Sequence, residues 1–312
     1  MKKILLVLLG LVILAVSFSG CGGGGENKKD DGMVDLWVLV AEYYDVPEDK
    51  QDQLGERACL YAYEYDKNGN LIEKKEFPVG NPERYTVTTY QYNEHGDCIS
   101  VKIDPTRQYP DMDVQPMVIE YEYEYDGELI TKKTTVGGRV ETYEYEGGRL
   151  QKIASGDGAS VSKGHRKFDE NGNMVEWCQR YSENGTDEVD RFVYSYDNKG
   201  RLIKIERFFN ADTVSSWTAE LRYDKNGHLE TAVERDRNGQ EEDPLRYKTD
   251  EHGNVVGYLS DNVQPFSFEY KKIRVTKERA EKLIRENNLL PQNLLHVSSG
   301  NLSYALLYRI EK

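Results

Sequence analysis

Cysteine is scarce in this chain, with four residues at Cys21, Cys59, Cys98 and Cys178, no two of them close together. The paired Cys-x-x-Cys spacing that redox motifs and structural zinc sites need is therefore absent. Three cysteines follow the N-terminal segment, and three cannot all pair with one another. One disulfide with a free thiol, or three small apolar side chains, both fit the sequence.

Catalytic and metal-binding motifs are also missing. The five histidines are scattered, without the His-Glu-x-x-His spacing of zinc enzymes. No Gly-x-Ser-x-Gly elbow, phosphate-binding loop or dinucleotide fingerprint occurs. Asp66-x-Asn68-x-Asn70 superficially matches a calcium loop, but Gly69 comes fourth, where an EF-hand has its glycine sixth. We predict no enzyme activity, no metal and no cofactor.

Positive charge is in deficit. The chain has 41 Lys and Arg against 55 Asp and Glu, a formal net charge of −14. An acidic balance disfavours binding to phosphate backbones or anionic lipid headgroups. We therefore predict no nucleic-acid partner.

A long hydrophobic run is lacking too, because the apolar stretch at residues 4–16 is too short for a comfortable membrane span. It follows Lys2 and Lys3 and ends in Ser19-Gly20-Cys21. Residues 1–21 resemble a bacterial lipoprotein signal peptide, which implies that Cys21 receives lipid chains such as palmitate and becomes the new N-terminus. The alternative is an ordinary signal peptide with an incidental cysteine.

Residues 22–32 begin with four glycines and continue with polar residues, as a flexible tether would. The sequence thus predicts an exported protein that is anchored to a bacterial membrane through Cys21. Its folded domain would face outside the cytoplasm.

Tyrosine is plentiful, with 23 residues against 8 Phe and 3 Trp. The segment from Tyr194 to Glu206 shows its use: aromatic residues alternate along a strand, Asp197 opens a turn, Gly200 closes it, and an apolar strand returns. This order favours a three-residue hairpin turn with a bulge, in which Asp197 pairs with Arg201 and Tyr196 faces Leu202.

The same unit recurs over about residues 60–260, at an irregular spacing that corresponds to two strands of ordinary length plus two turns. Shortened copies at Tyr125-Asp126-Gly127 and Tyr145-Glu146-Gly147-Gly148 favour two-residue turns. Cys98 holds the position that Leu71 and Leu202 hold in other copies, which favours packing for that cysteine. The pattern predicts an antiparallel meander of β-hairpins.

The Tyr-Asp turn with its following Gly and Leu resembles the YD-repeat (Rhs-type) family. Large members of that family build hollow β-shells, and the resemblance here implies a short, lipid-anchored bacterial member. Because the copies are few, we expect a mostly β fold whose sheet is open, twisted and curled. A weaker resemblance is to the cell-wall-binding hairpin repeats of choline- or glucan-binding proteins, which use Trp-Tyr pairs and a tighter period.

One helix is expected near the C-terminus, with Thr276 as its N-cap and Ala280, Leu283 and Ile284 on one side. A strand over residues 302–310 follows. The expected domains are a signal peptide at 1–21, a tether at 22–32, a hairpin-repeat domain at 33–270 and a cap at 271–312. The cap would cover an end of the sheet that is otherwise prone to aggregate.

Two interpretations of the tyrosines remain. They could serve mainly as cross-strand packing, worth about 0.2–1 kcal/mol per pair. Alternatively, exposed rings could form an aromatic binding face for glycans or a protein. The candidate residues for that face are Tyr63, Tyr65, Trp177, Tyr194, Tyr196, Trp217 and Tyr223.

Two functions follow from these observations. The preferred one is a surface-anchored, non-catalytic scaffold that binds a protein or a cell-envelope polysaccharide. The alternative is a purely structural envelope lipoprotein without a dedicated ligand.

Overall fold

The computed structural model describes residues 32–157, 163–169, 173–180, 186–259, 266–288 and 308–310. Almost every element is a β-strand, and the helices are few and short. In chain order the elements are β1 (Met33–Asp45), η1 (Glu48–Lys50), α1 (Gln51–Leu54), β2 (Arg57–Tyr65), β3 (Leu71–Glu76), β4 (Thr86–Tyr92), β5 (Cys98–Asp104), β6 (Met117–Asp126), β7 (Leu129–Thr135), β8 (Arg139–Glu146), β9 (Arg149–Asp157), β10 (Lys163–Phe168), β11 (Met174–Arg180), β12 (Glu188–Tyr196), β13 (Leu202–Phe209), β14 (Trp217–Tyr223), β15 (Leu229–Asp236), β16 (Leu245–Thr249), β17 (Val255–Leu259), β18 (Phe266–Thr276), α2 (Lys277–Asn288) and β19 (Tyr308–Ile310).

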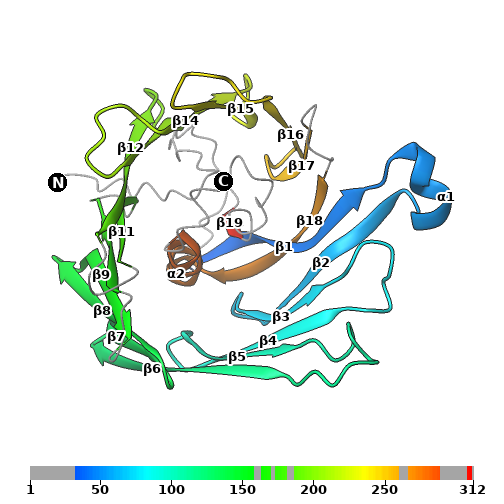
Figure 1. Ribbon diagram of the computed structural model, residues 1–312, viewed down its shortest axis with the longest axis horizontal. Coiled ribbons are helices and arrows are strands. Elements are labelled where there is room, and N and C mark those ends of the chain that lie inside the picture. Colours follow the sequence, from blue (N-terminus) through cyan, green and yellow to red (C-terminus); the bar gives the residue numbers. More distant parts are fainter. Residues whose placement is uncertain are drawn as a thin grey trace, which may run out of the picture.

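The sheet is closed. Every strand from β1 to β18 pairs antiparallel with the next, and β1 pairs both with β2 and with β18. Figure 1 shows the strands following one another around a ring, with α2 lying within its outline. The expectation of an open, curled sheet is therefore wrong, although the mostly β class and the helix near the C-terminus are as expected.

The error has a physical cause. The repeat pattern determines how a strand pairs with its sequence neighbours, and it is silent on whether the two ends of the array meet. Closure depends on β1, which precedes the repeats and hydrogen-bonds on both of its edges: residues 41–45 pair with β2, and residues 33–44 pair with β18.

The hairpin turns have the expected geometry. The Asp197 amide donates to the carbonyl of Arg201 at 2.9 Å, and Tyr196 pairs with Leu202 after a bulge at Ser195. Gly200 has a φ of 75°, a left-handed value that side chains other than glycine rarely adopt. The predicted three-residue turn is confirmed.

The shortened copies are two-residue turns, since Asp126 pairs with Leu129 and Glu146 with Arg149. The helix near the C-terminus is also as expected: the Arg279 amide donates to the Thr276 hydroxyl at 3.2 Å, which makes Thr276 an N-cap. Ala280 and Leu283 are buried on one side of the helix.

The turns that join β2 to β3, β4 to β5 and the later even-numbered strands up to β16 to their successors lie on one edge of the ring, because successive strands run in opposite directions. We call this edge the turn rim. β1 starts there as well, and the Lys277 amide of α2 donates to the Gly32 carbonyl at 2.9 Å. The end of the expected tether therefore lies beside α2.

The lipidation site at Cys21 and most of the tether lie outside the described residues. β18 continues through residues 266–276, so it spans the boundary that we expected between residues 270 and 271.

Candidate functional site

Tyrosine hydroxyls connect successive hairpin units. On β4, β6, β8, β12 and β14, the hydroxyl of a tyrosine donates to a backbone carbonyl near the start of the preceding strand. That strand belongs to the preceding hairpin unit, so each bond joins two units. The donors and acceptors are Tyr92 to Leu71 at 2.7 Å, Tyr123 to Cys98 at 2.8 Å, Tyr145 to Ile130 at 3.0 Å, Tyr194 to Met174 at 2.7 Å and Tyr223 to Leu202 at 2.7 Å. Tyr65 does the same to Leu39 of β1 at 2.7 Å.

These bonds explain why the aromatic residue of the unit is tyrosine and rarely phenylalanine. The ring packs on the sheet while its hydroxyl satisfies a carbonyl of the neighbouring unit. Burial raises the pKa of Tyr194 well above its usual value, and it raises the pKa of Tyr223 to about 12. The sequence analysis considered the tyrosines for packing and for binding, and it missed this hydrogen-bonding role.

The seven residues proposed from sequence as a binding face lie on β2, β11, β12 and β14. Tyr63 is buried, and Trp177, Tyr194 and Tyr196 pack against the same core cluster. The hydroxyls of Tyr65, Tyr194 and Tyr223 donate hydrogen bonds to backbone carbonyls. The Trp217 indole donates to Glu234 at 2.6 Å. They pack as parts of the sheet and do not form one exposed platform, and their part in binding stays a prediction.

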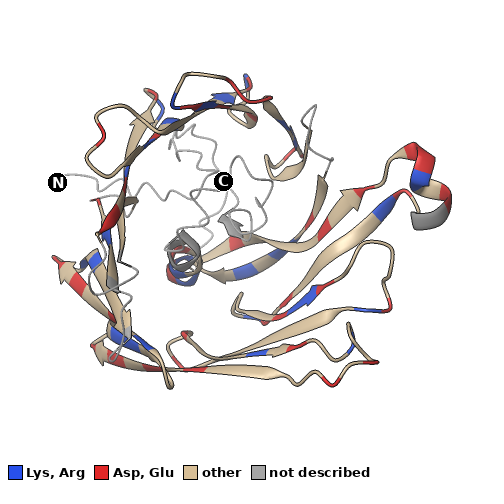
Figure 2. Cartoon of the chain, in the orientation of Figure 1, with Lys and Arg blue, Asp and Glu red and all other residues tan. Residues whose placement is uncertain are grey.

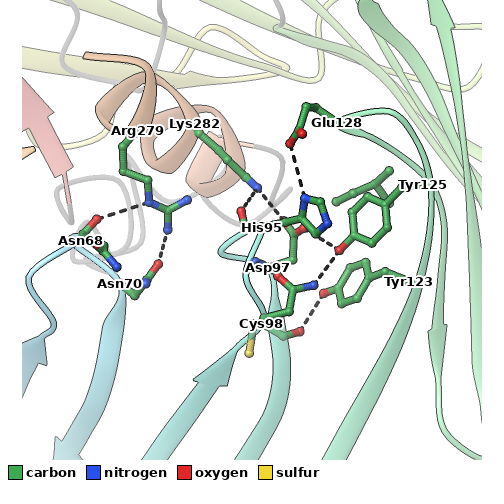
Figure 3. A network of polar contacts seen from close by, with 12 residues as sticks. Asn68, Asn70, His95, Asp97, Cys98, Tyr123, Tyr125, Glu128, Arg279 and Lys282 are labelled. Atoms are coloured by element: carbon green, nitrogen blue, oxygen red, sulfur yellow. Dashed lines mark hydrogen bonds and ion pairs between the residues drawn. The ribbon is translucent and has the colours of Figure 1, made fainter. Parts of the chain in front are cut away.

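The tyrosine side of the sheet can be followed around the ring, because directly paired residues of antiparallel strands point to the same face. Figure 3 shows Tyr123 and Tyr125 of β6 pointing toward Lys282 of α2. Since α2 lies within the ring in Figure 1, this is the inner face.

From β9 to β18 the inner face is mostly a buried apolar core, in which Asp190 and Glu234 are also buried. Ile153, Phe192, Ile205, Leu221 and Tyr258 are each at most 3% exposed and belong to one cluster. Aliphatic and aromatic side chains of paired strands meet there, so this half of the sheet has the composition of an ordinary protein interior.

From β3 to β8 the inner face is different. No hydrophobic residue between Tyr63 and Ile153 is fully buried, and all residues of that interval are described. Tyr90, Tyr121 and Tyr143 are half-buried, and Lys133 and Thr135 pair with tyrosines of β6. Rings, ammonium groups and hydroxyls therefore share this surface.

Two lysines of this half lie over tyrosine rings. The Lys133 Nζ is 4.1 Å from the centre of the Tyr121 ring, and the Lys74 Nζ is 4.4 Å from that of Tyr61. Such cation–π contacts contribute about 0.5–1 kcal/mol at exposed sites. Burial raises the pKa of Tyr121, so its hydroxyl remains a hydrogen-bond donor over the whole physiological pH range, as an unshifted tyrosine also does. We take the inner face of β3–β8 as the candidate binding face.

The outer face is charged. On β6, Glu122 and Glu124 alternate with the inward tyrosines and are exposed, and Lys132 of β7 pairs with Glu124 at 2.7 Å. Lys152 and Glu144 repeat this arrangement at 3.0 Å. Figure 2 shows both signs of charge distributed around the ring. Ionised side chains at this density favour contact with water.

A polar network joins α2 to the turn rim (Figure 3). Lys282 forms an ion pair with Asp97 at 2.9 Å and donates to the carbonyl of His95 at 2.6 Å. The Tyr125 hydroxyl donates to the other oxygen of Asp97 at 2.7 Å. Arg279 donates to the carbonyl of Asn68 at 3.3 Å and to the side chain of Asn70.

Sequence reasoning missed this network as well. It treated the helix near the C-terminus only as part of a cap. A signal was nevertheless present, because the β4–β5 turn has Asn93 first and Asp97 fifth, the reverse of the usual order in Asp66 and Asn70.

The structure decides between the two alternatives for the cysteines. Cys59, Cys98 and Cys178 are free thiols, so the disulfide alternative does not apply to the fold. Cys98 pairs with Tyr92 as Leu71 pairs with Tyr65, which supports its packing role. Among the described residues, no group of three His, Cys, Asp or Glu side chains is arranged to hold a metal ion.

The helices in the described part of the chain are all too short or too polar to cross a membrane.

No family model matches the chain, and no curated protein matches it either. Among solved structures it is similar to a porin-like protein from Bacteroides uniformis, with 10% identity over 77% of this chain and 96% of that one and a TM-score of 0.36. A porin-like protein from Bacteroides vulgatus shares 14% identity over 75% and 98% of the two chains, with a TM-score of 0.28. A structure of TcdB2-TccC3 without its hypervariable C-terminal region shares 13% identity over 70% of this chain and 16% of that one, with a TM-score of 0.21.

TM-scores in this range do not establish a shared fold or function, and the architecture given above rests on the strand pairing of this chain. The expected membership of the YD-repeat (Rhs-type) lipoproteins is nevertheless corrected, because no family model matches and the sheet closes where an open one was expected. The Tyr-Asp-x-x-Gly pattern specifies a bulged hairpin turn, and any antiparallel sheet can use such a turn.

Proposed function

We propose that this protein is a non-catalytic scaffold of the bacterial cell envelope that binds a polysaccharide on the inner face of β3–β8. One observation carries the proposal: no hydrophobic residue of that face is fully buried, and its tyrosines lie beside ammonium and hydroxyl groups, whereas residues such as Ile205 and Leu221 of β9–β18 are fully buried. Sugar rings stack on aromatic faces, and their hydroxyls need such donors and acceptors.

The location within the envelope rests on the N-terminal segment. Lipidation at Cys21 would hold the chain at a membrane after export. Because β1 starts at the turn rim, the anchor would reach the ring on that side. The charged outer face would then lie in water.

The non-catalytic part of the proposal rests on the sequence, which carries none of the nucleophile, acid–base or cofactor motifs considered above.

A purely structural role is the second candidate. Two observations favour it: the hydroxyls of Tyr194 and Tyr223 donate to backbone carbonyls within the sheet, and the outer face is charged. A protein that only maintains a sheet has no need of a half-buried aromatic surface, and this is why we rank it second.

The experiment measures binding of the mature chain, beginning at Cys21 and purified in detergent, to isolated cell wall and a panel of glycans. We expect saturable quenching of tyrosine fluorescence, and Tyr121→Ala should weaken binding about tenfold by removing a stacking ring. Glu122→Ala, one residue along β6 but on the outer face, is the matched control and should bind as the parent does.

Absence of saturable binding across the panel would rule out the polysaccharide function. Equal weakening by Tyr121→Ala and Glu122→Ala would show that the sugar binds away from the inner face.

A further inference from the structure

The repeat turns follow a rule in their first and fifth residues. The first residue is usually an aspartate whose carboxylate accepts hydrogen bonds from the turn, and in three of these turns an asparagine in fifth place donates back to it. Asn70 donates to Asp66 at 2.7 Å, Asn173 to Asp169 at 2.9 Å and Asn254 to Asp250 at 2.8 Å. The carboxylate therefore accepts its hydrogen bonds from residues of its own turn.

The β4–β5 turn reverses the two residues. Asn93 stands first, and its side-chain oxygen accepts from the Asp97 amide at 2.9 Å, so the turn itself is preserved. The carboxylate has moved to fifth place, where the side chain of Asp97 is 3% exposed. A carboxylate so withdrawn from water requires a cation or several donors.

The partners of Asp97 come from elsewhere in the chain. One of its oxygens accepts the Tyr125 hydroxyl of β6, and the other lies 2.9 Å from the Lys282 ammonium of α2. The carbonyl of His95 accepts from the same ammonium at 2.6 Å (Figure 3). A carboxylate and a carbonyl thus bind one amine, and an aromatic hydroxyl binds the second oxygen of that carboxylate.

The site lies beside a stretch of the ring in which the first residues of β1 do not pair with β2. Residues 41–45 of β1 pair with β2, whereas residues 36–38 pair with β19 instead. α2 contacts the turns on the far side of this gap through Arg279 and Lys282. The helix also approaches closely, because a Cβ on Gly69 would come within 2.8 Å of the Leu283 side chain.

We propose that Asp97, Tyr125 and the His95 carbonyl form a recognition site for a primary ammonium group, and that Lys282 occupies it as an intramolecular ligand which straps α2 across the gap between β1 and β2. The reversed order of Asn93 and Asp97 selects this turn for the lysine. This inference is independent of the polysaccharide function.

Lysine suits the site because its ammonium is compact and carries three donors, which can reach the carboxylate and the carbonyl together. A regular turn offers a neutral amide oxygen in the same place, and Arg279 uses that alternative at Asn70.

The first test is hydrogen exchange of the full chain, followed by mass spectrometry of peptides from α2. Lys282→Met should speed exchange over residues 277–288 about tenfold or more, because it leaves Asp97 buried without its cation. Lys277→Met is the matched control, since Lys277 is on the same helix but 70% exposed, and its exchange should match the parent. Unchanged protection in Lys282→Met would overturn the proposal.

The second test exchanges the turn residues. Asn93→Asp with Asp97→Asn restores the usual order and keeps the turn, yet it should release α2 to the same extent as Lys282→Met. The corresponding exchange at Asp169 and Asn173 has no counterpart on α2 in the described residues and should leave helix protection intact. Equal effects of the two exchanges would show that only turn stability matters.

The third test asks whether the site recognises an amine as such. In Lys282→Ala, n-butylammonium should raise the thermal midpoint by about 2 °C, whereas tetramethylammonium, which has no N–H donor, should not. Adding Asp97→Asn should abolish the response. An equal shift with both cations, or no shift with either, would contradict an ammonium site.

Discussion

The two halves of the ring are built from the same hairpin unit but differ in how deeply their inner faces are buried. In β9–β18 the inner positions are occupied by residues such as Phe192, Ile205 and Leu221, and they are buried. In β3–β8 the corresponding positions carry Lys74, Lys133 and several tyrosines, and they are half-buried. The tyrosine-to-carbonyl bonds are alike in both halves, and three-residue turns opened by Asp or Asn occur in both.

This comparison separates two contributions to the fold. The turn and the tyrosine bond fix the pairing of neighbouring strands wherever they occur. The apolar content of the inner face determines whether that face becomes core or stays accessible. The half with fewer aliphatic residues is therefore the one in which we place binding.

The largest expected difference concerns cavities in the inner face. Ile205→Ala should lower the free energy of unfolding by about 2–4 kcal/mol, because Ile205 is fully buried and its removal leaves a cavity. Ile103→Ala on β5 should cost about 1 kcal/mol, since Ile103 is half-buried. Urea unfolding of both variants measures the difference, and equal losses would show that the two halves are packed alike.

A smaller effect is expected from single hydroxyl groups. Tyr194→Phe should cost about 1–2 kcal/mol, because the Met174 carbonyl loses its donor in a buried setting. Tyr145→Phe in the other half removes a longer bond of 3.0 Å to the carbonyl of Ile130, which is half-buried whereas Met174 is fully buried, and it should cost less than 1 kcal/mol. Thermal unfolding of the two variants tests the ranking, which fails if Tyr145→Phe is the more damaging.

The smallest effect depends on pH. Burial tends to raise the pKa of Asp197, but hydrogen bonds from the Arg201 and Lys199 backbones and the Arg201 side chain hold it below the usual 3.8. A lowered folded-state pKa means that this carboxylate stabilises the fold above its unfolded-state pKa and loses that contribution as the pH falls through the folded-state value. Asp197→Ala should therefore cost about 1 kcal/mol at neutral pH and less in acid.

Local hydrogen exchange in the strands that flank each turn provides the measurement. The two-residue turn between Glu146 and Arg149 has an exposed glutamate, Glu146, in the place of that aspartate, so exchange around it should depend less on acid. A pH-independent effect of Asp197→Ala would contradict the assigned role of the carboxylate.

Much of the local structure could be predicted from the sequence. The bulged turn at Asp197–Arg201, the two-residue turns, the N-cap at Thr276 and the packing position of Cys98 all follow from short-range pattern, and the structure bears them out. The candidate site was predicted less well. The aromatic residues chosen from sequence, such as Tyr194 and Trp217, pack in the buried half, whereas Tyr121 and Lys133 were not selected.

The reason is that burial is not a local property. Tyrosines on alternate positions look the same in β6 and β12, and only the side chains on neighbouring strands decide which of them stay accessible. The contact of Lys282 with Asp97 is similar, because it joins residues far apart in the chain, although the reversed order of Asn93 and Asp97 marks the turn concerned.

The sequence by itself determined the hairpin unit, the antiparallel pairing of successive strands, the face on which the tyrosines lie and the position of the last helix, because each depends on backbone preferences and side-chain alternation over a few residues. Only the tertiary structure decided that the sheet closes, that one half has a buried core, and that α2 reaches the turns of β2–β5. These features require contacts between distant segments, and their free energies depend on which surfaces meet after the chain has folded.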